Sequence, residues 1–252
     1  MKKLLNLFVV LTVFLGLAFS TGLAQVDPPE VDEEMYPGTS IEVDKEVTTP
    51  AIPPVVDICL LQDETGSFFD DFTVLKGISG DIYDGIKAES PDAQFAVAGF
   101  RDYPISPYGW EGDWVYRLLS SMSSDRDQWI NGVNALMAGG GNDEPEAQYD
   151  AIVAATGPGV FNDPTLGEQN TCGWRDDSDV QRVLVVATDA PFHIPTIPPA
   201  YHFKYHASTL TALLDENITL IGLEAPGADC ELYMLATGTG GSVQVLSSNS
   251  SN

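Results

Sequence analysis

The feature that most constrains the fold is an apolar run of strand length, residues 55–61, that leads directly into a series of oxygen-bearing side chains. The run reads Val-Val-Asp-Ile-Cys-Leu-Leu, which predicts a buried strand. Carboxylates and hydroxyls follow it: Asp63, Thr65, Ser67, Asp70 and Asp71. Side chains at every second position after a buried strand can converge on one point as the backbone turns. Oxygen ligands of this kind suit a hard divalent cation, although the same residues are ordinary in turns.

Predicted strands and helices alternate through the rest of the chain. Strands are predicted at 55–61, 93–100, 114–121, 183–188, 218–223 and 242–246, and helices at 68–87, 125–136, 145–155, 201–215 and 229–236. The run at 183–188 is apolar throughout, which is typical of a sheet covered on both faces. The pattern predicts an α/β fold: a doubly wound, mainly parallel, six-stranded sheet with helices on both faces. Sites in such sheets form at the carboxyl ends of the strands.

Further carboxylates follow the predicted strands at that same edge. Asp102 comes after the second strand and Asp189 after the strand at 183–188. A glycine run at 139–141 leads to Asp143, Glu144 and Glu146. These three acids would repel a phosphate, and the Lys of a phosphate-binding loop is missing, so a nucleotide site is disfavoured. Convergence of acids from four segments indicates a cation site.

The first residues indicate export. Residues 1–24 have the basic start, apolar middle and small-residue end of a signal peptide, and the apolar stretch is short for a membrane span. Residues 25–54 are rich in acids and proline and are predicted to form a flexible linker. The α/β domain is expected over 55–247, with a tail at 248–252. We expect a secreted or extracellular protein, or a periplasmic or cell-surface one, with no stable membrane span once the signal is removed.

The acidic composition limits the classes of partner that the chain can bind. The net charge is −26, from 37 acidic and 11 basic side chains. Nucleic acid is excluded as a partner, because phosphate binding needs clustered Lys and Arg. Such acidity suits cation binding, and it equally suits solubility alone.

Three cysteines allow at most one internal disulfide. Cys59 lies in the first predicted strand and is interpreted as a buried small hydrophobe. Cys172 and Cys230 are expected near opposite edges of the sheet. A bridge between these two would require the loop before Arg182 to reach across, and the pattern disfavours it.

Two catalytic or metal alternatives remain open. Asp63 is placed as the nucleophile of a Mg2+-dependent phosphohydrolase would be, but Thr65 stands where a second acid is expected. His202 and His206 are spaced as in zinc-binding helices, yet Phe203 replaces the expected Glu. These histidines and His193 are interpreted as surface or core residues, with zinc as the alternative.

The chain resembles a von Willebrand factor A domain, and within that superfamily the inserted domain of integrin β subunits. The resemblance covers residues 55 to about 246 and rests on five ordered segments, at 63–71, 99–108, 143–146, 172–175 and 188–193. The family's first motif is Asp-x-Ser-x-Ser, and Thr65 keeps the hydroxyl. The integrin loop closed by a cysteine pair is missing between Tyr108 and Tyr116. An integrin α-type partner is therefore not expected.

The resemblance implies three neighbouring cation sites. The residues matching the metal-ion-dependent adhesion site, whose ion accepts a carboxylate from the ligand, are Asp63, Thr65, Ser67, Glu146 and Asp189. Asp70 and Asp71 match an adjacent regulatory site. The residues matching a third, Ca2+ site are Asp102, Asp143, Glu146 and Pro145 through its carbonyl. Gly141 stands where the family has an Asn, and Asn142 is the expected replacement.

The expected function is a secreted, non-enzymatic adhesion module. It would use Mg2+ or Ca2+, with Mn2+ able to substitute, to bind a carboxylate on an extracellular protein or polymer. The alternatives are a structural envelope or matrix protein whose cations only stabilise it, and the phosphohydrolase described above.

Overall fold

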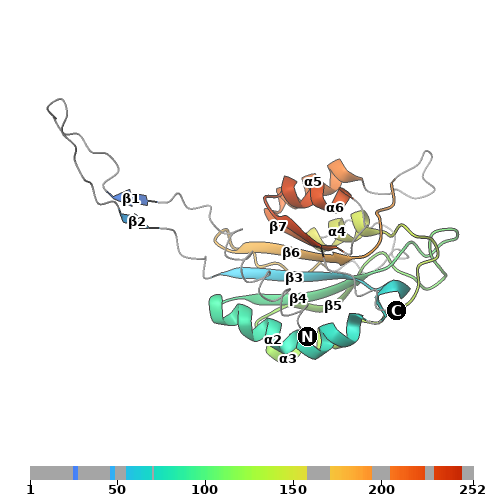
Figure 1. Ribbon diagram of the computed structural model, residues 1–252, viewed down its shortest axis with the longest axis horizontal. Coiled ribbons are helices and arrows are strands. Elements are labelled where there is room, and N and C mark those ends of the chain that lie inside the picture. The colour runs from blue at the N-terminus through green and yellow to red at the C-terminus, as the bar shows by residue number, and fades with distance from the viewer. Residues whose placement is uncertain are drawn as a thin grey trace, which may run out of the picture.

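A six-stranded sheet with helices on both faces forms the body of the computed structural model, which describes residues 25–27, 46–48, 55–69, 71–157, 171–194, 205–224 and 230–245 (Figure 1). The strand order is β5-β4-β3-β6-β7-β8, and every neighbouring pair is parallel except β4 with β5. The strands of this sheet are β3 Val56–Asp63, β4 Gln94–Phe100, β5 Arg117–Ser123, β6 Gln181–Thr188, β7 Ile218–Glu224 and β8 Ser242–Val245. The predicted doubly wound, mainly parallel α/β fold is confirmed.

Helices α2 Asp71–Glu89 and α3 Arg126–Asn134 cover one face of the sheet. Helices α4 Gln148–Thr156, α5 His206–Asp215 and α6 Cys230–Gly238 cover the other. All eight residues of the central strand β3 are buried, as expected for a strand covered on both sides. Successive side chains alternate between the faces, so Ile58 and Leu60 join the core under α2 and α3. Cys59 and Leu61 join the core on the other side.

Several element boundaries differ from those predicted. β3 runs on to Asp63, so the first site residue lies within the strand. The predicted helix at 68–87 is split into a 3-10 turn, Gly66–Phe68, followed by α2. The helix predicted from Pro145 begins only at Gln148, because Glu146 forms a parallel bridge with Phe192 and cannot also be helical.

Outside the domain, β1 Gln25–Asp27 and β2 Glu46–Thr48 pair antiparallel within the predicted linker. The predicted signal peptide and the C-terminal tail lie outside the described residues, as does most of the linker. Within the described part of the chain, no helix is long and apolar enough to cross a membrane.

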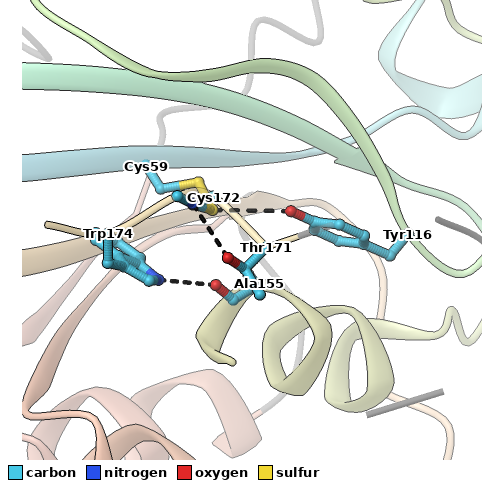
Figure 2. The surroundings of a disulfide bond; sticks show 7 residues. Cys59, Tyr116, Ala155, Thr171, Cys172 and Trp174 are labelled. Atoms are coloured by element: carbon cyan, nitrogen blue, oxygen red, sulfur yellow. Dashed lines mark hydrogen bonds between the residues drawn. A yellow bond between two sulfur atoms is a disulfide. The ribbon is translucent and has the colours of Figure 1, made fainter. Parts of the chain in front are cut away.

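The structure corrects the interpretation of the cysteines. Cys59 is bonded to Cys172, with their Cα atoms 6.2 Å apart (Figure 2). The segment that carries Cys172 packs against the sheet and α4: the Met122 N–H donates to the Cys172 carbonyl, and the Trp174 indole donates to the Ala155 carbonyl. Cys172 therefore lies opposite the middle of β3 and is not confined to the edge of the sheet. Arg175 strengthens this anchor through an ion pair of 2.7 Å with the buried carboxylate of Asp57.

The disulfide should contribute strongly to stability, because it joins residues 113 positions apart. Cys59→Ala should lower the free energy of unfolding by roughly 3–5 kcal/mol in denaturant titrations, from lost loop-closure entropy. Cys172→Ala and the reduced wild-type protein should show the same loss in free energy of unfolding. Unfolded, unreduced wild type should show one reactive thiol of three; three reactive thiols would disprove the bridge.

Candidate metal-binding site

The carboxylate of Asp63 anchors the site. Asp63 ends β3 and is fully buried. Its Oδ1 accepts hydrogen bonds from the Thr65 N–H (2.9 Å) and the Thr65 hydroxyl (2.6 Å). Its Oδ2 accepts from the Thr188 hydroxyl (2.8 Å), which the parallel register of β3 and β6 brings alongside. The two oxygens of the Asp63 carboxylate are thus held by different segments of the chain: Oδ1 by Thr65 and Oδ2 by Thr188.

A continuous series of oxygens leads from Asp63 to the surface. The Thr65 and Ser67 hydroxyl oxygens lie 3.2 Å apart, and the Ser67 hydroxyl donates to Asp189 Oδ1 (2.9 Å). When the Thr65 hydroxyl donates its hydrogen to Asp63 and the Ser67 hydroxyl donates its hydrogen to Asp189, no hydrogen lies between the Thr65 and Ser67 oxygens. Lone pairs of both oxygens are then available to a cation. Ser67 is exposed and Asp189 half-buried, so the series opens to solvent.

Glu146 lies on the same edge of the sheet. Its N–H donates to the Pro191 carbonyl (2.9 Å), and its carbonyl accepts from the His193 N–H (3.0 Å). Its carboxylate is next to Gly141, where an added Cβ would lie 2.8 Å from Glu146 Oε1 and 3.3 Å from Thr65 Cγ2. Gly141 also has a positive φ of 69°. Its lack of a side chain therefore lets Glu146 and Thr65 approach the same point.

The electrostatics of these carboxylates are those expected of residues that hold a divalent cation. Burial raises the pKa of Asp63 to about 7. Burial, and then the charges of Asp63, Asp102 and Asp143, raise the pKa of Glu146 to about 10. The Oε2 atom of Glu146 is buried without a hydrogen-bond donor. A divalent ion would supply both the positive charge and the missing partner, so the residues present fit such an ion.

The glycine-rich loop is fixed by a network that sequence reasoning missed. The buried Glu64 accepts from the Met137 N–H (2.7 Å) and pairs with Arg117 at 3.1 Å. Its backbone carbonyl accepts from the Gly139 N–H (2.9 Å). The Gly141 N–H donates to the carboxylate of Asp113 (3.1 Å).

Two arginines complete this network. The guanidinium groups of Arg101 and Arg117 lie 3.8 and 4.1 Å from the ring centre of Trp114. Arg101 also pairs with Asp113 at 3.4 Å and donates to the Met137 carbonyl. The sequence offered one signal for this network: Arg101, one of only 11 basic residues, directly precedes the predicted site residue Asp102.

A second group of metal-ligating side chains lies beside Glu146. One ligand atom from each of Asp102, Asp143 and His193 lies within 4.8 Å of the others. His193 Nε2 is 3.0 Å from Asp102 Oδ1 and 3.5 Å from Asp143 Oδ1. Burial raises the pKa of Asp143 to about 6, with His193 opposing the shift and Asp102 adding to it. The interpretation of His193 as an ordinary surface or core residue missed this grouping.

The remaining predicted residues have simpler places. Pro145 lies in the bend just before Glu146. Asp71 is the exposed first residue of α2, and Asp70 lies outside the described residues. The side chain of Asn142, the expected replacement ligand, donates to the Pro107 carbonyl (2.7 Å).

Removing cations should make stability depend on pH in an unusual direction. The pKa of Asp63 rises from 3.8 to about 7 on folding and that of Glu146 from 4.5 to about 10. The folded state then binds more protons than the unfolded state between these values, so stability falls as pH rises. In chelator, the melting temperature should decline from about pH 4 to about pH 10, with both groups contributing below pH 7 and Glu146 alone above it.

Saturating Mg2+ should abolish this decline, because the ion favours the deprotonated carboxylates. Glu146→Gln should reduce the decline, whereas Asp81→Asn, at an exposed position on α2, should leave it unchanged. A melting temperature in chelator that rises over this interval would contradict the electrostatic description.

Comparison with known proteins supports the fold. No protein-family model and no curated protein matches the chain. Two solved structures of proximal thread matrix protein 1 from the mussel byssus are similar, with TM-scores of 0.50 and 0.51 at 16% and 17% identity. The matches cover 75% and 77% of this chain but only 43% and 42% of those chains. In the second of them, a zinc ion occupies the MIDAS motif, the metal-ion-dependent adhesion site. The domain described here has the fold of a von Willebrand factor A-like domain.

Proposed function

We propose that this chain is a secreted, non-enzymatic binding module that recognises an acidic group through a divalent cation. The ion would be held by Asp63, Thr65, Ser67, Glu146 and Asp189. The observation that carries the proposal is the unbroken series of oxygens from the buried Asp63 to the solvent-facing Ser67 and Asp189. The partner would be an extracellular protein or polymer that offers a carboxylate.

The donor set explains why the ion would accept an external acid. Thr65 and Ser67 are neutral, so they leave the ion electron-poor. The side open to solvent is the side on which a partner's carboxylate can complete the coordination. Because the ion inverts the local charge, a chain with net charge −26 can still bind an acidic partner.

Oxygen donors favour Mg2+, Ca2+ or Mn2+ at this site. The zinc bound in the corresponding motif of the mussel protein supports a divalent ion there. By resemblance, Asp70 and Asp71 would bind a regulatory ion beside it. No integrin α-type partner is proposed.

The catalytic alternative has less support. Asp63 is fully buried, and both of its oxygens accept hydrogen bonds, so the geometry does not present it as a nucleophile. The structural alternative has one observation in its favour, since the similar mussel structures are of a thread matrix protein. A cation with a purely structural role predicts no partner at all, which separates the two proposals.

Asp189→Ala should remove partner binding and leave the fold largely intact, because Asp189 is half-buried at the open end of the series. Immobilised protein should retain partners from its native extracellular medium in Mg2+ and lose them in chelator. We expect the variant to weaken retention by more than about 100-fold, since losing even an outer-sphere partner of a metal costs 10- to 100-fold. Asp81→Ala is the matched control. Retention that persists in excess chelator would rule out the mechanism.

Thr65→Asp should weaken binding of the acidic partner while still allowing the cation to bind. The added charge makes the ion less electron-poor and repels an external carboxylate. Thr65→Ser keeps the hydroxyl and should bind as wild type does. Calorimetric titration with Mg2+, followed by the partner, separates the two effects. Equal partner affinity in the Asp and Ser variants would count against carboxylate recognition.

A further inference from the structure

Asp102, Asp143 and His193 come from three segments that meet beside the adhesion-type site. Asp102 follows β4, Asp143 lies in the loop after the glycine run, and His193 follows β6. The separations from His193 Nε2 are 3.0 Å to Asp102 Oδ1 and 3.5 Å to Asp143 Oδ1. With metal–ligand bonds of about 2.0–2.2 Å in tetrahedral geometry, adjacent ligand atoms around a zinc ion lie roughly 3.3–3.6 Å apart. The two separations from His193 Nε2 are therefore close to the spacing around such an ion, and all three ligand atoms lie within 4.8 Å of one another.

The cluster is built into the fold. Asp102 is fully buried, and its Oδ1 accepts from the Tyr103 N–H (2.7 Å) while facing the imidazole. The ring of His193 packs edge-on against Tyr108, with centroids 5.0 Å apart, and lies 5.7 Å from the ring of Tyr103. Its backbone is fixed by the hydrogen bond to Glu146. Rigid orientation of this kind is what a histidine ligand needs. Asp143, with its side chain 34% exposed, forms the side through which an ion can reach the cluster.

A simple ion pair between a protonated His193 and the two carboxylates does not satisfy every buried atom. The Oδ2 atom of Asp102 is buried and finds no hydrogen-bond donor. Burying a carboxylate oxygen without a partner is costly. A divalent ion compensates the charge of the whole carboxylate and binds the neutral imidazole.

We propose that Asp102, Asp143 and His193 form a separate binding site for a zinc-class divalent ion. Imidazole nitrogen suits zinc and its transition-metal neighbours, whereas Ca2+ and Mg2+ prefer oxygen alone. The ligand set thus differs from the all-oxygen Ca2+ set that the family resemblance implies for this region. The site goes beyond the proposed recognition function, since it requires no partner.

The test uses the full chain carrying Asp189→Ala, so that the first site is weakened. Zinc binding is measured by equilibrium dialysis, and the ligands of bound zinc by X-ray absorption. We expect one tight zinc with a nitrogen ligand. Adding His193→Ala should weaken zinc binding by about 100-fold or more, given the 10- to 100-fold cost of losing an outer-sphere partner. Adding His206→Ala should change nothing, because His206 pairs with Glu231 at α6, away from the cluster.

Unchanged zinc affinity in the His193→Ala protein, or bound zinc with oxygen ligands only, would overturn the proposal. The absorption measurement needs no substitution at His193, so it decides the matter even if that variant fails to fold. Mg2+ binding in otherwise wild-type His193→Ala protein should persist. Failure to find an acidic partner would leave these zinc results unaffected.

Discussion

Burial of the Asp63 carboxylate at the end of the central strand is the constraint on which the site depends. A carboxylate removed from water is tolerated only when donors or a cation compensate it. Here, Thr65 and Thr188 supply three hydrogen bonds from two segments. Because β3 pairs with β4 on one side and β6 on the other, the loops after all three strands meet around this one group. The parallel sheet thereby converts dispersed acids into a single centre.

The residues around Asp63 are held more firmly on one side of the site than on the other. On the side of the glycine run, the loop is held by the ion pair between the buried Glu64 and Arg117 and by the half-buried arginines stacked on Trp114. On the other side, Ser67 is exposed and Asp189 is only half-buried. A fixed inner wall and an open outer side suit an ion that must stay bound to the protein while it accepts a ligand from outside.

Glu146 links the site around Asp63 to the neighbouring cluster. Its carboxyl responds to Asp63 on one side and to Asp102 and Asp143 on the other, which is why its pKa rises so far. Its backbone holds His193. A cation bound beside Asp63 and another beside Asp102 and Asp143 would both reduce the repulsion between these carboxylates and Glu146. At this edge of the sheet, the negative charge of the chain would favour bound cations.

The sequence alone determined the alternation of strands and helices and the oxygen-bearing motif after the first strand, because both rest on local periodicity and spacing. It also placed Asp102 and Asp189 at one edge, since parallel strands share a direction. Only the tertiary structure decided that Cys59 pairs with Cys172, 113 positions away. Only the tertiary structure places Glu146 in a parallel bridge, outside any helix, and His193 beside two carboxylates. These features depend on contacts between distant segments, and local patterns carry no signal for such contacts.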